Sequence, residues 1–242
     1  ISKYNSDGSK QWTRLLGASG FVLGQSISTA ADGSIYITGI TYGGLDGQTN
    51  SGFSDVFISK YNTDGIKQWT RLLGTSENDY GQSISTAADG SIYITGITEG
   101  NLDGQTNSGG GDVFISKYNS DGIKQWTQLL GTSSSDFGRS ISTAADGSIY
   151  ITGETNGDLD GQTNSGLTDA FISKYNTDGI KQWTRVLGTS SYDHGRSIST
   201  ADDGSIFITG ITREIDNSSI NAFISKYNSD GIEQWTQLLR TS

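Results

Sequence analysis

One short segment, Ile-Ser-Lys-Tyr-Asn, recurs five times along the 242 residues, and this repetition constrains the fold more strongly than any local propensity. The segment begins at Ile1, Ile58, Ile115, Ile172 and Ile224, so the spacings are 57, 57, 57 and 52 residues. A chain with such a period builds one supersecondary unit per repeat and buries its core between neighbouring units. The sequence therefore predicts a tandem array of one structural unit.

Each period contains four short runs rich in β-branched and aromatic residues, and no stretch shows a helical period. In the second copy these runs cover residues 56–62, 67–73, 82–87 and 91–98. Two of the four connections carry Asp-Gly, the strongest short-range hairpin signal, and we expect type I′ turns there. Turn chemistry accounts for the Asp residues of these hairpins. The repeated unit is thus predicted to be a four-stranded antiparallel meander.

A meander of this kind, repeated in tandem, predicts an all-β fold: a β-propeller of four-stranded antiparallel blades, about 57 residues per repeat, with five blades or as part of a larger ring. The third run has the smallest side chains, which suits the innermost strand. The Trp-containing run is then outermost, with its Trp packed between blades. A stack of blades that does not close into a ring is a second possibility.

This arrangement predicts a single domain that starts within a blade. We expect a half blade and four full blades at residues 1–17, 18–74, 75–131, 132–188 and 189–242. Because the sequence opens inside a repeat and without Met, we expect it to be a piece of a longer protein.

The charge and composition limit the possible partners. The net charge is −10, with 26 acidic and 16 basic residues, and an acidic surface repels a phosphate backbone, so we expect no nucleic-acid partner. No apolar run approaches the roughly 18 residues of a membrane span, so no membrane insertion is expected. The chain has no Cys and therefore neither disulfides nor thiolate metal sites. The oligomeric state stays open.

The two Asp-Gly hairpins of a meander lie on one face of the blade, and the two longer connections lie on the other. The copies differ mainly in these longer connections, as expected for a binding surface on a rigid scaffold, although exposed loops also diverge without any function. The residues predicted to form a ligand-binding loop face are Tyr42, Asp79, Tyr80, Glu99, Asp136, Phe137, Tyr192, Asp193 and His194.

The motif Leu-Asp-Gly-Gln-Thr-Asn occurs in three of the longer connections, and another acid follows each copy. Carboxylate and amide oxygens in a Gly-rich loop suit Ca²⁺, although the spacing is not that of an EF-hand and Asx-capped turns explain the same residues. The fourth copy lacks the motif and should bind no calcium. The candidate calcium ligands are Asp46, Asn50 and Asp55, Asp103, Asn107 and Asp112, and Asp160, Asn164 and Asp169.

The pattern resembles the bacterial β-propeller repeat family known as SBBP, and the resemblance extends over essentially the whole chain. The matching elements are Asp79-Tyr80-Gly81, Asp89-Gly90, Tyr93-Ile94-Thr95-Gly96, Phe114-Ile115-Ser116-Lys117-Tyr118 and Trp126. The sequence is also similar to repeats of large secreted cyanobacterial proteins, which implies an extracellular or cell-surface bacterial protein. The family defines no catalytic residues, so the resemblance implies a fold more firmly than an activity.

We expect the protein not to be an enzyme. His194 is the only His, and no Ser-His-Asp spacing, phosphate loop or metal-binding His pair is present. The leading hypothesis is a structural or interaction module that binds a protein or a glycan through its loop face. The alternatives are a calcium-dependent, lectin-like glycan binder and a glycan hydrolase that uses the loop acids Asp79, Asp136 and Asp193.

Overall fold

The computed structural model describes residues 1–17, 20–213 and 220–239, which form five antiparallel sheets and no α-helix. One sheet has two strands, β1 (Ser2–Tyr4) and β2 (Lys10–Thr13). The other four sheets, blades 1 to 4, have four strands each: β3 (Val22–Thr29), β4 (Ile35–Thr41), β5 (Asp55–Tyr61) and β6 (Lys67–Leu73); β7 (Asp79–Thr86), β8 (Ile92–Thr98), β9 (Asp112–Tyr118) and β10 (Lys124–Leu130); β11 (Asp136–Thr143), β12 (Ile149–Thr155), β13 (Asp169–Tyr175) and β14 (Lys181–Leu187); β15 (Tyr192–Thr200), β16 (Ile206–Arg213), β17 (Ile220–Tyr227) and β18 (Glu233–Leu239).

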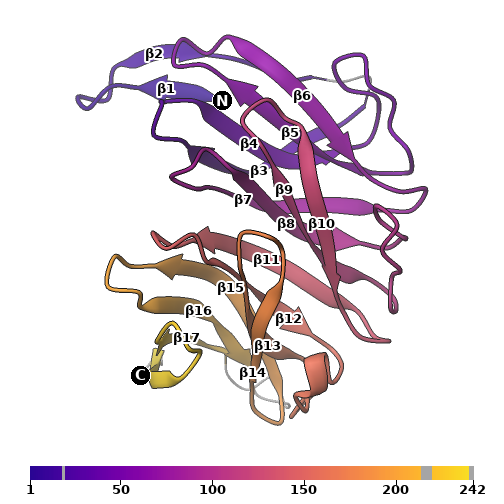
Figure 1. Cartoon of the computed structure of the whole chain (residues 1–242), viewed down its shortest axis with the longest axis vertical. Helices are drawn as coiled ribbons and strands as arrows, with labels where there is room; N and C mark the ends of the chain where they lie inside the picture. The colour runs from indigo at the N-terminus through magenta and orange to yellow at the C-terminus, as the bar shows by residue number, and fades with distance from the viewer. Residues whose placement is uncertain (18–19, 214–219, 240–242) are drawn as a thin grey trace.

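The strands of each blade are hydrogen-bonded in chain order, which confirms the four-stranded antiparallel meander. The blades follow one another from the indigo N-terminal end to the yellow C-terminal end (Figure 1). The first strands of successive blades contact one another, β3 with β7, β7 with β11 and β11 with β15. These strands are therefore innermost, as the small side chains of the third run predicted, and the Trp-containing strands are outermost.

The strand limits agree closely with the sequence prediction in the second copy, with one informative exception. The predicted run 67–73 coincides with β6, and the run 91–98 begins one residue before β8. The innermost strand β7 begins at Asp79, three residues before the predicted run 82–87, and includes a bulge between Gly81 and Ser83. One 3₁₀ turn, η1 (Leu159–Gly161), lies in the long connection of blade 3.

The Asp-Gly hairpins do not form the predicted type I′ turns. In the hairpin between β5 and β6, Gly65 N donates to Asn62 O at 3.0 Å and Asn62 N donates to Ile66 O at 3.0 Å, and only Gly65 has a positive φ. This is a type I turn followed by a glycine bulge. The Asn62 side chain stabilises it, because Oδ1 accepts hydrogen bonds from Asp64 N and Ile66 N at 3.0 and 2.8 Å.

Successive blades are held together by an apolar layer and by the outer Trp side chains. Between blades 1 and 2, Tyr36, Val56 and Ile84 belong to one buried cluster. Trp69 lies against the outer hairpin of blade 2, where its Nε1 donates to Ser120 O at 3.2 Å. The same Trp contact recurs at the other junctions, which confirms the predicted packing role.

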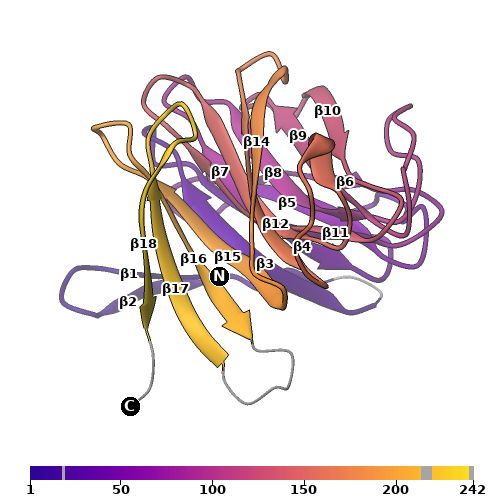
Figure 2. The ribbon, with the colours of Figure 1, turned by 90° about the horizontal axis from the view of Figure 1, so that it is seen from below.

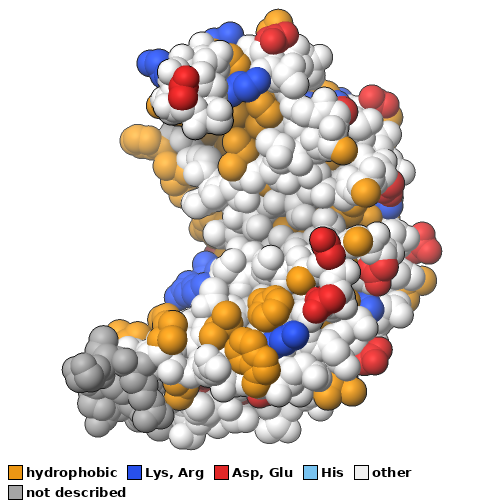
Figure 3. Space-filling model, turned by 90° about the vertical axis from the view of Figure 1, so that its left-hand side faces the viewer, with side chains coloured by type: hydrophobic (Ala, Val, Ile, Leu, Met, Phe, Trp, Pro, Cys, Tyr) orange, Lys and Arg blue, Asp and Glu red, His pale blue; other side chains and the backbone are white. Residues whose placement is uncertain are grey.

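The two ends of this row of blades leave apolar side chains uncovered. Ile84 is 5% exposed between blades 1 and 2, whereas Ile27, at the equivalent position of blade 1, is 57% exposed. At the other end, every residue of β18 is exposed, and Figure 2 shows β17 and β18 at the front of the last blade without a further sheet over them. The space-filling view has a concave outline on one side (Figure 3).

Candidate functional site

The longer connections converge at one end of the blades, which we call the long-loop face. The register brings the start of β3 opposite the end of β4, and the end of β4 opposite the start of β5, through the pairs Val22↔Thr41 and Thr41↔Asp55. The tight hairpins lie at the opposite end, the hairpin face. The predicted division of the loops between two faces therefore describes the molecule.

The residues predicted to bind a ligand differ widely in exposure. Tyr42 and Glu99 are exposed, whereas Tyr80, Phe137, Tyr192 and His194 are partly buried. Glu99 accepts a hydrogen bond from Asn78 Nδ2 at 2.7 Å, and Tyr192 stacks on His194 with ring centroids 6.5 Å apart. These side chains belong to the same face but not to one continuous exposed patch.

The three acids predicted on this face are buried instead of exposed in loops. Asp79 and Asp136 are the first residues of β7 and β11, and Asp193 is the second residue of β15. Asp79 Oδ2 accepts hydrogen bonds from Thr75 N at 2.6 Å and from Thr75 Oγ1 at 3.0 Å, and the same pair of bonds recurs at Asp136 and Asp193. Burial raises the pKa of Asp79 above the usual value, and the charge of Asp55 raises it further.

The candidate calcium ligands within one loop bond to three different parts of blade 1. Asp46 has a positive φ and contacts Lys67 and Thr70, so its carboxylate faces the outer strand β6. Asn50 Nδ2 donates to Thr41 O at 3.1 Å, and Asp55 Oδ2 accepts from Ser51 N at 2.8 Å. The equivalent residues of blades 2 and 3 repeat these bonds: Asp103, Asn107 and Asp112, and Asp160, Asn164 and Asp169.

The two acids of this loop in blade 1 have opposite electrostatic environments. Burial alone would raise the pKa of Asp46, but the hydrogen bonds from Lys67 and Thr70 and the Lys67 charge outweigh burial, so the pKa lies below its usual value. Burial raises the pKa of Asp55, whose carboxylate forms no ion pair with a cation within the described part of the chain. Asp46 is therefore paired with a cation, whereas Asp55 is a carboxylate whose charged form is destabilised by burial.

One polar cluster was not anticipated from the sequence. Glu154 at the end of β12 is buried and contacts Arg139, while its Oε2 lies 2.8 Å from His194 Nδ1 and 3.9 Å from Arg196. The signal was available in the sequence, because the other three copies carry Ile at this position, namely Ile40, Ile97 and Ile211. The only His of the chain, His194, belongs to this cluster.

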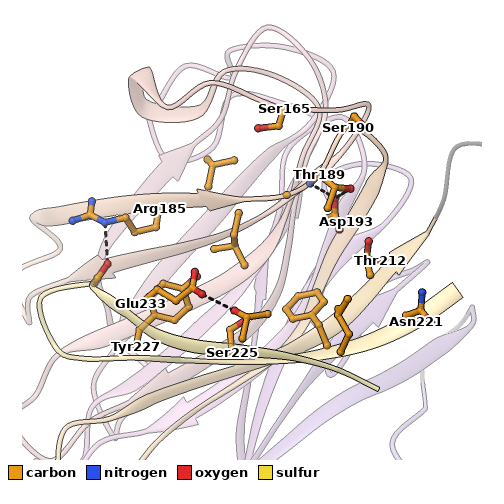
Figure 4. A pocket seen from close by; sticks show the side chains of 17 residues that line it. Ser165, Arg185, Thr189, Ser190, Asp193, Thr212, Asn221, Ser225, Tyr227 and Glu233 are labelled. Carbon is orange, nitrogen blue, oxygen red and sulfur yellow. Dashed lines mark hydrogen bonds between the residues drawn. The ribbon is translucent and has the colours of Figure 1, made fainter. Parts of the chain in front are cut away.

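A cavity of about 700 Å³ lies between blades 3 and 4. Arg185 and Glu233 lie at its hairpin end, and Asp193 and Asn221 at its long-loop end (Figure 4). In blades 1 to 3 the long connection places a buried Leu over the equivalent strands, namely Leu45, Leu102 and Leu159. The corresponding connection of blade 4 includes residues 214–219, outside the described part of the chain, so the lining residues alone do not define a ligand site.

Within the described ranges, no cluster of three or more His, Cys, Asp or Glu side chains is arranged to hold a metal ion. No helix among residues 1–17, 20–213 and 220–239 is long and apolar enough to cross a membrane.

Two of the repeats match a known family. Residues 68–103 and 125–160 match the family described as SBBP: Beta-propeller repeat. Both segments run from an outer Trp strand through the first two strands of the next blade into its long connection, and the match confirms the resemblance inferred from the sequence motifs.

Relatives with curated descriptions share the repeats but are much longer. The chain is 31% identical over 189 residues to Regulatory protein FlaEY of Caulobacter vibrioides, covering 68% of this chain and 20% of the relative. It is 27% identical over 202 residues to an uncharacterized WD repeat-containing protein of Acanthamoeba polyphaga mimivirus, covering 69% of this chain and 14% of the relative. The chain thus spans a fifth or less of these relatives.

Among solved structures, a gluconolactonase from Xanthomonas campestris is similar to the chain with a TM-score of 0.49 and 16% identity. The alignment covers 98% of this chain and 66% of that structure.

Proposed function

The chain carries β-propeller repeats of the SBBP family, and we propose that it is a non-enzymatic interaction module of an exported or cell-surface protein, which binds a protein partner through its long-loop face. The regulatory name of the Caulobacter relative supports a role in binding over turnover. The fold alone does not distinguish binding from catalysis, because function depends on the site and not on the scaffold.

The observation that carries the proposal is a group of exposed aromatic side chains on the long-loop face of blade 1. Phe21 is 80% exposed, Tyr42 46% and Phe53 74%. Tyr42 N donates to Phe21 O at 2.9 Å, so these two residues are adjacent, and Phe53 lies in the loop that leads into β5. Exposed aromatic residues are enriched at interface hot spots because they offer a large contact area at a low entropic cost.

The other blades do not repeat this group. In blade 2 the positions of Phe21, Tyr42 and Phe53 are occupied by Asn78, Glu99 and Gly110. Blades 3 and 4 each keep one large apolar or aromatic residue of the three, Leu167 and Tyr192. A group of three confined to one blade is poorly explained by folding, since blade 2 folds without any of them. It is better explained by a partner that approaches blade 1.

The hairpin face offers a contrast within the same molecule. One Ile is exposed at each outer hairpin, spaced one blade apart, namely Ile66, Ile123, Ile180 and Ile232. Single apolar residues scattered over a surface are normal and need no partner. They provide matched controls of similar hydrophobicity.

The placement of the acids supports binding over hydrolysis. A glycan hydrolase would need two carboxyl groups that reach the scissile bond. Asp79 and Asp136 are buried at the blade junctions, and their Oδ2 atoms hold the preceding loops.

The test compares two variants of the chain by affinity capture from surface and secreted fractions, with quantitative mass spectrometry. We expect the Phe21→Ser/Tyr42→Ser/Phe53→Ser variant to lose at least one partner that the wild type captures. The Ile66→Ser/Ile123→Ser/Ile180→Ser variant should retain that partner, because its changes lie on the hairpin face.

Equal capture by both variants and the wild type would contradict the assignment of the face. If the wild type binds a glycan on an array and the loop-face variant does not, the partner of this face is a glycan and not a protein. Turnover of any glycan by the wild type would contradict the non-enzymatic assignment.

A further inference from the structure

Two buried aspartates lie side by side at each junction between complete blades. At the first junction, Asp79 N donates to Ser54 O at 2.8 Å, and Ser54 forms a parallel bridge with Asn78. This bridge places the next residues, Asp55 of blade 1 and Asp79 of blade 2, next to each other. The bond recurs from Asp136 N to Gly111 O and from Asp193 N to Thr168 O, both at 2.7 Å, which gives the pairs Asp112/Asp136 and Asp169/Asp193.

In five of these six carboxylates, one oxygen is buried and has no hydrogen-bond donor. At the first junction, Oδ2 of Asp55 accepts from Ser51 N and Oδ2 of Asp79 accepts from Thr75 N, whereas both Oδ1 atoms are buried and unpartnered. A buried carboxylate oxygen without a donor or a cation is costly, and native proteins rarely leave one so. The unpartnered Oδ1 atoms belong to Asp55, Asp79, Asp112, Asp136 and Asp169.

Both acids are present at all three junctions between complete blades. The position of Asp79 is occupied in blade 1 by Val22, and the position of Asp55 is occupied in blade 4 by Asn221.

Glycines allow the backbone to pack closely against each pair. Gly74 lies against Asp55, and a Cβ at Gly74 would overlap Asp55 Oδ1; Gly131 and Gly188 have the same relation to Asp112 and Asp169. A Cβ on Gly52 would lie 2.6 Å from Thr75 O, so a carbonyl oxygen of the neighbouring loop lies close to Gly52, three residues before Asp55.

We propose that each pair binds a divalent cation, Ca²⁺ in the first instance, through the Oδ1 atoms of two aspartates from neighbouring blades. Two carboxylates match the charge of one such ion, and backbone carbonyls and water supply the other oxygens of the six to eight that Ca²⁺ takes. The ion removes the repulsion between the paired charges and links the inner strands of adjacent blades. This site differs from the loop sites predicted from the sequence, because it uses Asp79, Asp136 and Asp193 and excludes Asp46 and Asn50.

The alternative for such a pair is one shared proton, which also removes the repulsion. The two differ in what the protein takes up at neutral pH. The cation model requires calcium uptake with a fixed stoichiometry, whereas the proton model requires none.

The experiment is equilibrium dialysis of the chelator-stripped chain against Ca²⁺ at neutral pH, with bound calcium measured by mass spectrometry. We expect three ions per chain, one for each pair. The Asp79→Asn variant should bind two ions, and the Asp79→Asn/Asp136→Asn/Asp193→Asn variant none. Circular dichroism checks that each variant keeps its β-sheet.

The matched control is Asp46→Asn/Asp103→Asn/Asp160→Asn, which removes the same number of acids from the same face. This control should still bind three ions. No uptake by folded wild-type protein at millimolar calcium would overturn the proposal in favour of the shared proton or buried water. Loss of uptake in the control, with full uptake in the junction variant, would also overturn it.

The stripped wild type gives a second readout that needs no variant. A cation bound only by the folded state must raise the midpoint of thermal unfolding. The midpoint should rise with calcium in the wild type and in the control and stay unchanged in the triple junction variant. An equal rise in the junction variant would place the ion elsewhere and refute the assignment.

Discussion

The two equivalent residues Ile84 and Ile27 provide a direct test of whether the end of the blade row is uncovered in solution. Ile84 is 5% exposed and packs with Tyr36 and Val56 of the preceding blade. Ile27 has the same place in blade 1 and is 57% exposed. Replacing each of them by Ala in turn removes the same atoms from the same type of strand, so differences in strand propensity cancel.

The expected magnitudes follow from burial. Ile→Ala removes three carbon groups, each worth about 0.8 kcal/mol when buried, so the transfer cost at Ile84 is about 2 kcal/mol. The cavity left between two blades brings the total to about 3 to 4 kcal/mol. At Ile27 less than half of the side chain is shielded and no closed cavity forms, so the loss should be about 1 kcal/mol or less.

The assay is urea unfolding followed by Trp fluorescence, at a concentration where light scattering reports a single chain. The midpoint should fall clearly for Ile84→Ala and little for Ile27→Ala, with unchanged m-values. Equal losses would refute the reasoning, because they would mean that Ile27 is covered in solution. In that case, a midpoint that depends on protein concentration would identify association between chains, and one that does not would identify closure of the row.

Three further predictions concern two glycines, the Glu154 cluster and the junction aspartates. Gly81→Ala should destabilise the fold by about 1 to 3 kcal/mol, because its Cβ would lie 2.7 Å from Gly39 O of the preceding blade, whereas Gly24→Ala should be neutral since nothing lies within 4 Å; thermal unfolding of both variants checks this. Glu154→Gln should cost about 3 to 5 kcal/mol because it leaves the Arg139 charge unpaired, while Arg139→Gln/Glu154→Ile, the pair that blade 2 carries as Gln82 and Ile97, should cost far less; comparable losses in urea unfolding would show that the ion cluster itself is needed. In chelator, stability should increase as the pH falls from neutral toward the ordinary pKa of aspartate, because burial raises the pKa of the junction aspartates in the folded state, which then binds more protons than the unfolded state. The increase should be smaller in the triple junction variant, which keeps Asp55, Asp112 and Asp169, and an undiminished increase there would assign the effect to other groups.

Much of the fold followed from the sequence because the repeat averages out local ambiguity. The predicted run 67–73 coincides with β6, and the small residues of the run 82–87 correctly indicated the innermost strand. The Trp role also followed, because an aromatic residue at every repeat of the outer strand has only the neighbouring blade to pack against.

The turn type and the state of the acids could not be derived in the same way. Asp-Gly is compatible with a type I′ turn and with a type I turn plus a bulge, and the side chain of Asn62, two residues before Asp64, stabilises the second. Asp79 looked like a loop residue because its strand begins with polar residues. Its burial comes from the preceding blade, a contact between residues far apart in sequence that no local pattern encodes.

The residues at the two ends of the blade row provide a further test of the aspartate-pair proposal. The half blade β1–β2 already lies against the outer hairpin of blade 1, so a junction between the two ends of the row would involve Val22 or Asn221 without the pair of acids of an internal junction. Such a junction would need no cation, so calcium should stabilise the internal junctions and leave any contact between the two ends unaffected. Sedimentation velocity at high protein concentration, with calcium and with chelator, checks this: self-association that disappears in chelator while the β-sheet signal is retained would show that the ends depend on an ion despite lacking the acids.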